Sequence, residues 1–341
     1  MIHAKNISNK YFSSDIPDFI YSTDSNSDAV FQILDEQDNT VHIAILSPYQ
    51  GYITLYELSE LFTDYMRKYN KTILSFHIDV VQGISSIRNT ITVIYCTDIP
   101  AQSPEEFLAN HFLTLTDVKE TQPDTTEYFH FIGYDTPKIS ILTENEPPVY
   151  TLLPDTHLIN GVTSFSFSLN DLALQANLSI NEIKGCKVSA GDRIFHLFKG
   201  NAHNTMNWRF CNAFNVMETF AVPGALSIIT KDAHNTAKVS RKLVAYDFNK
   251  SQQYEYESTP LNRQEFLWAS QLLASNCIID QNNRQIIITD AESEIKVLPG
   301  EENKIKFSWQ YEHGKGLIGD DSTQAQQYSR IHTEEYDKQY N

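Results

Sequence analysis

The chain has 341 residues and a formal net charge of −17 at pH 7, and it is long enough for two or three domains, each with its own core. Because every contact with a phosphate requires a local cation, this acidity opposes binding to nucleic acid and to anionic membranes. The N-terminal segment lacks the apolar stretch of a signal peptide, and no apolar run approaches the roughly 20 residues of a membrane helix. We therefore expect no nucleic acid and no membrane as partners, and a protein that stays in the cytoplasm in which it is made or leaves it without Sec export.

Residues 1–28 are rich in Ser, Asp and Asn, which predicts an N-terminal arm before the first strand. Residues 29–102 follow as a β-sandwich domain, because segments such as Ala29–Leu34 and Val41–Leu46 alternate apolar and polar positions. One helix interrupts this pattern. Leu58, Leu61, Phe62, Tyr65, Met66 and Tyr69 have the spacing of one apolar helix face, which we interpret as packing on the sandwich and not as a partner groove.

Residues 103–200 are predicted to form a second β-sandwich domain. Ser103 is placed to cap a helix, with Pro104 at its first position and Glu106 three residues after the cap. The strand pattern of the first domain then recurs, from Pro137–Leu142 to Arg193–Phe198, and Leu169–Leu172 matches Leu58–Leu61. This correspondence indicates a possible duplication of the first domain.

Residues 205–313 are predicted to form a β-rich third domain with one helix, after a polar linker at 200–207. All three tryptophans lie in it, and Asn262 with Glu265 forms the signature of a helix capping box. The expected strands are Leu226–Thr230, Lys242–Phe248, Gln253–Ser258, Cys277–Asp280, Ile286–Asp290 and Lys304–Tyr311. The last segment, 314–341, is polar and predicts either a disordered end or an arm that orders only on a neighbouring subunit.

No residue pattern indicates a metal or cofactor. Cys96, Cys186, Cys211 and Cys277 are far apart in sequence, which favours free thiols over a zinc site or disulfides. Asp24 to Asp28, with Asp35 twelfth, resembles a calcium loop superficially, but Ala29 replaces the glycine that the turn requires. We interpret this stretch as an Asx-rich surface turn and expect no metal ligands and no cofactor.

The motifs of nucleophilic, phosphate-binding and zinc-dependent enzymes are absent from the sequence, so no catalytic residue is assigned and we expect no enzyme. A β-sandwich glycosidase needs only two carboxylates, for which conceivable residues are Glu218, Asp232, Glu255, Glu257, Asp290, Glu292 and Glu294. The many aromatic residues are interpreted mainly as core and cross-strand pairs, although tyrosines and tryptophans could also line a sugar-binding platform. His130 and His196 are interpreted as strand residues and not as ligands.

Several segments together resemble a family of uncharacterised proteins from phages and prophages of Bacteroides-type bacteria. They are Asn207–Thr219, Tyr254–Leu261, the helix to Ser275, Ile287–Asp290, Lys306–Tyr311, Ile53–Leu61 and Phe107–Leu113. The resemblance covers most of the chain and implies a virion component of the tail or baseplate, built of serial β-sandwich or barrel domains. It defines no functional residues.

The expected protein is therefore mostly β, with serial β-sandwich domains and a few short helices. We expect a structural subunit of a phage or prophage virion, located in the particle, that contacts other virion proteins and forms a homo-oligomer. Two alternatives remain open at this point: a carbohydrate-binding or adhesive protein with a glycan as partner, and a glycoside hydrolase.

Overall fold

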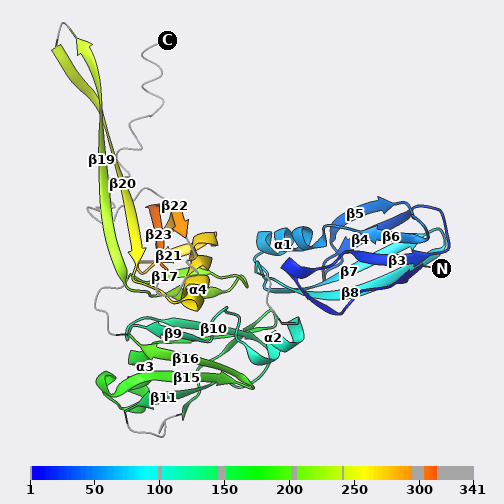
Figure 1. The fold of residues 1–341 in the computed structure, drawn as a ribbon, viewed down its shortest axis with the longest axis horizontal. Coiled ribbons are helices and arrows are strands. Elements are labelled where there is room, and N and C mark those ends of the chain that lie inside the picture. The colour runs from blue at the N-terminus through cyan, green and yellow to red at the C-terminus, as the bar shows by residue number, and fades with distance from the viewer. Residues whose placement is uncertain are drawn as a thin grey trace.

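The computed structural model describes residues 2–98, 102–144, 151–200, 206–239, 242–293 and 303–312. The chain is mostly β, with separate sheets in series and four α-helices among the described residues, which confirms the predicted fold class. Three hydrophobic cores follow one another along the sequence, and we name the surrounding regions domain 1 (residues 2–98), domain 2 (102–200) and domain 3 (206–312). Figure 1 shows them as three β bodies joined near the middle of the molecule.

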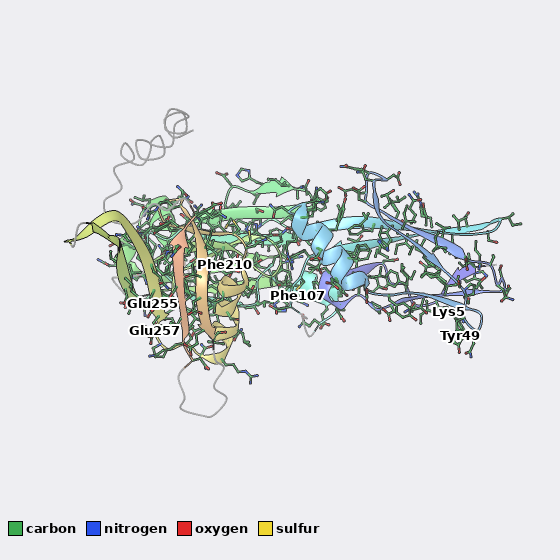
Figure 2. All side chains as sticks on the ribbon, turned by 90° about the horizontal axis from the view of Figure 1, so that it is seen from above. Lys5, Tyr49, Phe107, Phe210, Glu255 and Glu257 are labelled. Atoms are coloured by element: carbon green, nitrogen blue, oxygen red, sulfur yellow. The ribbon has the colours of Figure 1, made fainter. Side chains whose placement is uncertain are left out.

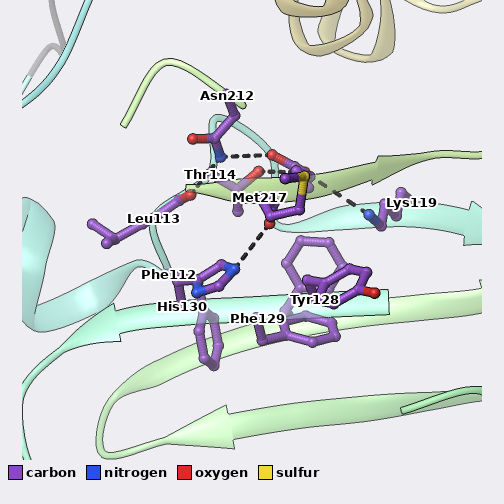
Figure 3. A pocket seen from close by; sticks show the side chains of 11 residues that line it. Phe112, Leu113, Thr114, Lys119, Tyr128, Phe129, His130, Asn212 and Met217 are labelled. Atoms are coloured by element: carbon purple, nitrogen blue, oxygen red, sulfur yellow. Dashed lines mark hydrogen bonds and ion pairs between the residues drawn. The ribbon is translucent and has the colours of Figure 1, made fainter. Parts of the chain in front are cut away.

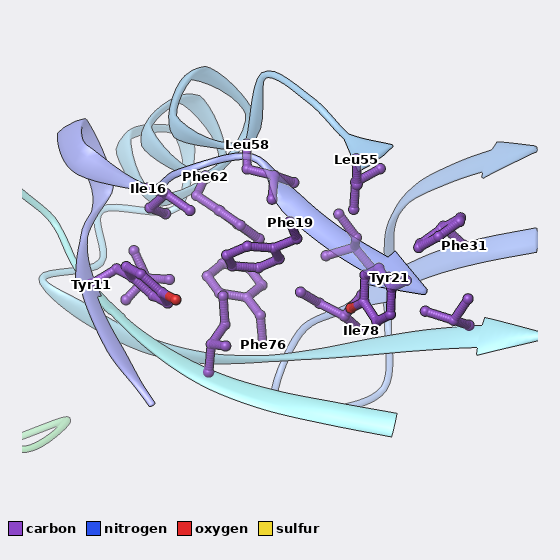
Figure 4. Close-up of a cluster of buried hydrophobic side chains, with 14 of the residues drawn as sticks. Tyr11, Ile16, Phe19, Tyr21, Phe31, Leu55, Leu58, Phe62, Phe76 and Ile78 are labelled. Atoms are coloured by element: carbon purple, nitrogen blue, oxygen red, sulfur yellow. The ribbon is translucent and has the colours of Figure 1, made fainter. Parts of the chain in front are cut away.

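Domain 1 contains a five-stranded sheet of order β2-β8-β7-β4-β5 and a small sheet of order β1-β3-β6. Its elements are β1 (Ile2–Ala4), β2 (Lys10–Phe12), β3 (Phe19–Thr23), β4 (Ala29–Leu34), β5 (Thr40–Leu46), β6 (Tyr52–Leu55), α1 (Leu58–Lys68), β7 (Ile73–Gln82) and β8 (Ser85–Ile94). The helix α1 buries Leu58, Phe62 and Met66, as the predicted apolar face requires. Figure 4 shows the resulting core, in which Phe62 meets Phe76 at 4.4 Å between ring centroids.

The prediction of an N-terminal arm over residues 1–28 is wrong. This stretch contributes β1, β2 and β3 to the two sheets of domain 1, and Phe19 and Tyr21 on β3 are fully buried. The polar residues that suggested an arm occupy the connections and the outward positions of these short strands. The apolar residues at alternate positions of Phe19–Thr23 carried the correct signal, because a strand buries every second side chain.

Domain 2 contains a five-stranded sheet of order β12-β11-β15-β16-β9 and a small sheet of order β10-β14-β13. Its elements are α2 (Pro104–Asn110), β9 (Val118–Thr121), β10 (Glu127–Ile132), β11 (Lys138–Thr143), β12 (Thr151–Leu152), β13 (His157–Ile159), β14 (Val162–Phe167), α3 (Leu169–Ala176), β15 (Ile183–Ala190) and β16 (Arg193–Lys199). Ser103 caps α2 by accepting a hydrogen bond from the Glu106 backbone N–H, as predicted.

Domains 1 and 2 share one strand order. In each large sheet the first strand, β2 or β9, pairs in parallel with the last, β8 or β16, and the other pairings are antiparallel. In each domain a helix follows a strand of the small sheet, and Leu58–Leu61 and Leu169–Leu172 form equivalent first turns of α1 and α3. The two domains thus share a topology where their sequence patterns match. That this likeness arose by duplication stays a prediction.

Domain 3 is one seven-stranded sheet of order β18-β17-β21-β22-β23-β20-β19 with helix α4 packed against it. Its elements are β17 (Trp208–Cys211), β18 (Met217–Phe220), β19 (Gly224–Val239), β20 (Lys242–Ser258), α4 (Arg263–Ala274), β21 (Ile278–Asp280), β22 (Gln285–Ser293) and β23 (Ile305–Tyr311). The predicted capping box of Asn262 and Glu265 starts α4. Trp208 and Trp309 are fully buried in this core.

A long two-stranded ribbon leaves domain 3. The three strands predicted at 226–230, 242–248 and 253–258 are in fact one hairpin, β19 paired with β20 from Gly224 and Ser258 to Val239 and Lys242. Only Tyr254–Glu257 of β20 pairs with β23, so the rest of the hairpin extends beyond the sheet, as Figure 1 shows. Residues 201–205 of the linker predicted at 200–207, and the C-terminal arm predicted at 314–341, lie outside the described residues.

Candidate functional site

The three domains meet in a single apolar cluster. Phe214 of domain 3 stacks on Phe107 of domain 2 at 5.1 Å, and Phe12 of domain 1 lies 5.7 Å from Phe107 and 6.3 Å from Phe214. The remaining buried members are Ile94 and Cys96 of domain 1, Leu108, Leu113 and Val162 of domain 2, and Ala213 and Val216 of domain 3. Burial of aromatic rings from three domains in one cluster fixes their relative placement.

The loop between β17 and β18 delivers Phe214 to this cluster. Asn212 shapes the loop, because its Oδ1 accepts hydrogen bonds from the backbone N–H groups of Phe214 and Val216. Asn215 adopts a left-handed conformation with φ of 58°, which asparagine tolerates better than most residues. The loop also bonds domain 1, since the N–H of Thr97 donates to the carbonyl of Ala213 at 3.0 Å.

A buried polar network joins domains 2 and 3. Lys119 on β9 lies 2.6 Å from the Glu127 carboxylate of β10 and 3.8 Å from the Glu218 carboxylate of β18. Thr114 Oγ1 and Trp268 Nε1 both donate to Glu218 Oε1, at 2.9 and 2.7 Å. Burial raises the pKa of Glu127, and the nearby Lys119 ammonium opposes that rise. A cation between two carboxylates limits the cost of burying all three charges.

His130 on β10 extends the network toward β18. Its Nε2 lies 2.9 Å from the carbonyl oxygen of Met217, so Nε2 carries the proton, and Nδ1 accepts from the Ser164 hydroxyl at 2.7 Å. Desolvation at the junction lowers the pKa of His130 to about 4, against a smaller opposite effect of the Met217 carbonyl. His130 is therefore neutral near pH 7, which agrees with its interpretation as a strand residue.

The buried polar network around Lys119 and His130 has no room for a substrate. Figure 3 shows the side chains around it, and the cavity that they enclose measures about 10 Å³. That volume holds about one water molecule. Glu127 and Glu218 are the two carboxylates that the fold brings around one cation, but a glycosidase pair requires an open cleft between them. The arrangement therefore acts on the docking of domain 3 to domain 2.

Four of the other conceivable catalytic carboxylates lie on β20 and β22, on either side of Ser308 and Lys306 of the strand β23 between them. Glu255 pairs with Lys306 at 3.0 Å and Glu257 with Lys304 at 3.4 Å, and Figure 2 shows both glutamates on the same sheet. Asp290 and Glu292 are exposed positions of β22, whose register places them opposite Ser308 and Lys306. The side chain of Asp232 and the whole of Glu294 lie outside the described part of the structure.

The acidic residues near the N-terminus lie in separate turns. Strand β4 runs between Asp28 and Asp35, and Asp28 accepts a hydrogen bond from Ser47. Burial alone would raise the pKa of Asp35, but hydrogen bonds from Asn39, Gln37 and Tyr65 outweigh it and lower the pKa. Asp35 therefore organises the β4–β5 turn. Within the described residues, no three His, Cys, Asp or Glu side chains group as a metal site would require.

Two of the four cysteines are neighbours, which the sequence did not indicate. Cys211 ends β17 and Cys277 directly precedes the paired strand β21, with the Cys211 N–H donating to the Cys277 carbonyl at 3.1 Å. All four cysteines are free, and Cys96 and Cys186 are buried. Burial raises the pKa of Cys211 to about 12, and the neighbouring Cys277 adds to this effect. Such a thiol is protonated and slow to react at neutral pH.

The ribbon is the largest projecting feature of the described chain. β19 is the last strand of its sheet, so its outer edge offers unpaired backbone N–H and carbonyl groups. From the pair Ile229 and Gln253 onward, β23 no longer pairs with β20, and the eleven residues 229–239 of β19 correspond to about 35 Å of strand. An unpaired strand edge of this length is a template for pairing with another chain.

No protein-family model and no curated protein matches the chain. Among solved structures it is similar to a chimeric titin Z1Z2 carrying a decorin peptide, with a TM-score of 0.19, 8% identity, and coverage of 59% of this chain and 97% of that one. It is also similar to Escherichia coli alpha-2-macroglobulin activated by porcine elastase, with a TM-score of 0.24, 9% identity, and coverage of 92% of this chain and 33% of that one. TM-scores this low carry no argument about function.

Among the described helices, none combines the length and the apolar character that crossing a lipid bilayer requires.

Proposed function

We propose that this chain is a structural subunit of a bacteriophage or prophage virion, in the tail or baseplate, and that it assembles through the β19–β20 ribbon. The virion context rests on the resemblance of segments such as Asn207–Thr219 and Tyr254–Leu261 to phage and prophage proteins. The assembly role rests on one observation, the extension of the hairpin beyond the sheet that supports it.

A projecting ribbon of this kind needs a partner to be stable. An isolated two-stranded hairpin is marginally stable in water, because its residues lose conformational entropy without burying a face against a third layer. A strand from a neighbouring subunit on the β19 edge supplies the missing backbone hydrogen bonds. The ribbon then connects one subunit to the next and fixes their relative position.

The rest of the molecule suits a structural subunit whose three domains keep a fixed arrangement. The Phe12, Phe107 and Phe214 cluster and the buried Lys119 network hold the three domains in one arrangement. Pairing at the ribbon therefore places the whole subunit and not a single loosely tethered domain. The partners are other copies of this chain and other virion proteins, in a particle assembled in the bacterial cytoplasm.

The test shortens the ribbon without disturbing its base. Replacing residues 231–251 with Asn-Gly leaves Thr230 and Gln252 as the last pair, closed by a two-residue turn of the type that hairpins favour. The matched control, Ser240→Asn with Arg241→Gly, places the same turn residues at the end of the full-length ribbon. Solution mass is measured by light scattering over a range of protein concentrations.

We expect the wild-type chain and the control to form the same defined oligomer, and the shortened variant to remain a monomer with unchanged thermal stability of its domains. A shortened variant with the wild-type mass contradicts ribbon-mediated assembly. The virion placement has a separate test, mass spectrometry of particles purified from a host that produces them, in which absence of this chain's peptides contradicts it.

A further inference from the structure

A groove lined by tyrosines lies on domain 1, on the side where β6 ends the small sheet. It has a volume of about 460 Å³, and Tyr49, Tyr52 and Tyr56 line it together with Ser47, Gln50 and Thr54. Figure 2 labels Lys5 and Tyr49 near the end of domain 1 that lies farthest from Glu255 and Glu257. The groove therefore lies at the opposite end of the molecule from the sheet of domain 3.

The backbone explains why the tyrosines share one surface. Successive side chains of a strand point to opposite faces, so Ile53 and Leu55 of β6 enter the core while Tyr52 and Thr54 face outward. Tyr56 directly follows the strand and is also exposed. Tyr49 joins them through a tight turn in which Tyr49 and Tyr52 exchange backbone hydrogen bonds at 2.8 and 3.0 Å. Gln50 and Gly51 both have positive φ there, of 51° and 80°, as a type I′ turn requires.

These tyrosines do not serve the core. Tyr49, Tyr52 and Tyr56 are 75%, 45% and 62% exposed, whereas Tyr21 on the adjacent strand is fully buried. Single exposed aromatic residues are ordinary, but three around one hollow form a concave aromatic surface of the size of small ligand sites. Gln50 Nε2 donates to the Tyr49 hydroxyl at 3.3 Å, which orients that ring.

The chemistry of the lining selects a class of ligand. Aromatic faces stack on the apolar faces of sugar rings, while tyrosine hydroxyls and the groups of Ser47, Gln50 and Thr54 bond sugar hydroxyls. No lining side chain of the described groove is charged. The Lys5 ammonium lies over the Tyr52 ring, 5.1 Å from its centroid.

We propose that this groove binds a neutral oligosaccharide. Uncharged walls match a ligand without charge, because no lining side chain can pair with a charged group of the occupant. The outward residues of Tyr52–Tyr56 extend over about 13 Å of strand, so the groove accommodates a short run of sugar rings and not a single ring. This inference is independent of the assembly role of the ribbon.

The experiment screens the full-length chain against an array of neutral hexose and N-acetylhexosamine oligosaccharides and then measures the strongest one by saturation-transfer NMR and calorimetry. The test variants are Tyr49→Ala and Tyr56→Ala. The matched control is Tyr134→Ala, which removes a tyrosine that is 86% exposed on domain 2. Tyr56→Phe keeps the stacking face and removes only the hydroxyl.

We expect each groove variant to weaken binding about tenfold or more, Tyr56→Phe to weaken it less than Tyr56→Ala, and Tyr134→Ala to leave it unchanged. The affinity should be unchanged between 50 and 500 mM salt, a range over which the Debye length changes about threefold. The reason is that no ionised side chain lines the groove. Failure of every neutral oligosaccharide to bind overturns the proposal. An equal loss of oligosaccharide affinity in the Tyr134→Ala control also overturns it. A fall in the solution mass of the Tyr49→Ala variant overturns it as well, because the occupant would then be a second copy of the chain.

Discussion

The small sheets of domains 1 and 2 begin from the same pair of strands and differ in where the third strand is added. In domain 1 the pair β3 and β6 gains β1 beside β3, so β6 is left at the edge. In domain 2 the equivalent pair β10 and β14 gains β13 beside β14, so β10 is left at the edge. The third strand, β1 or β13, is thus added on opposite sides of the shared pair in the two domains.

The edge strands β10 and β6 have different neighbours. Domain 3 packs against β10 through the His130 and Met217 contact and the neighbouring Lys119 network. The β6 edge of domain 1 is bordered by the tyrosine groove, which the described chain leaves open. The difference teaches that an unpaired edge strand of this fold is where the domain meets another component, which is domain 3 in one copy and, in our proposal, a ligand in the other.

The largest predicted effect is at the covered edge. Lys119→Met leaves Glu127 and Glu218 buried without their cation, so we expect the free energy of unfolding to fall by about 3–5 kcal/mol. Lys304→Met is the control, because its exposed pair with Glu257 contributes about 0–1 kcal/mol. Urea unfolding followed by the fluorescence of the three tryptophans of domain 3 measures both. Equal effects of the two variants would show that the network does not hold the junction.

A smaller effect at the same edge depends on pH. The pKa of His130 is about 4 in the folded protein and 6.5 for an ordinary histidine, so the unfolded chain takes up a proton below pH 6.5 and the folded chain does not. Folding stability from this residue is therefore present above pH 6.5 and is lost as the pH falls toward 4, by up to about 1.4 kcal/mol per pH unit.

His130→Gln should remove this part of the pH dependence, and His196→Gln should retain it, because His196 lies on β16 away from the Met217 contact. Urea unfolding of the three proteins at pH 7, 6 and 5 measures the difference. Parallel stability curves for wild type and His130→Gln would contradict the assignment.

The smallest effect is expected at the open edge. Tyr49→Ala removes a side chain that is mostly exposed, so the free energy of unfolding should change by no more than about 0.5 kcal/mol. The same urea experiment gives the value. A loss above about 2 kcal/mol would mean that Tyr49 supports the fold, and the contrast between the covered and open edges would then disappear.

Local patterns in the sequence predicted much of the fold. Period-2 alternation located Ala29–Leu34 as a strand to the residue, and cap chemistry located α2 and α4 because N-cap side chains bond N–H groups only three residues away. The N-terminal strands were missed because each is only three to five residues long and lies among polar connections.

The sites could not be predicted in the same way, because they depend on contacts between distant residues. Lys119, Glu127 and Glu218 come from three strands of two domains, and Cys211 and Cys277 are brought together by strand pairing. The continuous ribbon was missed because no local signal distinguishes one strand of 17 residues from two short ones. The one local sign of the groove is that two of the three outward positions at 52, 54 and 56 carry a large aromatic residue, where a solvent-facing position is usually polar.

The most direct test of ribbon-mediated assembly is amide hydrogen exchange of the full-length chain, followed by mass spectrometry over a concentration series. The peptides of interest cover Gly224–Val239 and Lys242–Ser258, with the core strand Ile73–Gln82 as an internal reference. We predict that the ribbon exchanges rapidly in dilute protein and gains protection as the solution mass rises, while the reference stays constant. Ribbon protection that is already complete in the monomer and independent of concentration would contradict the account.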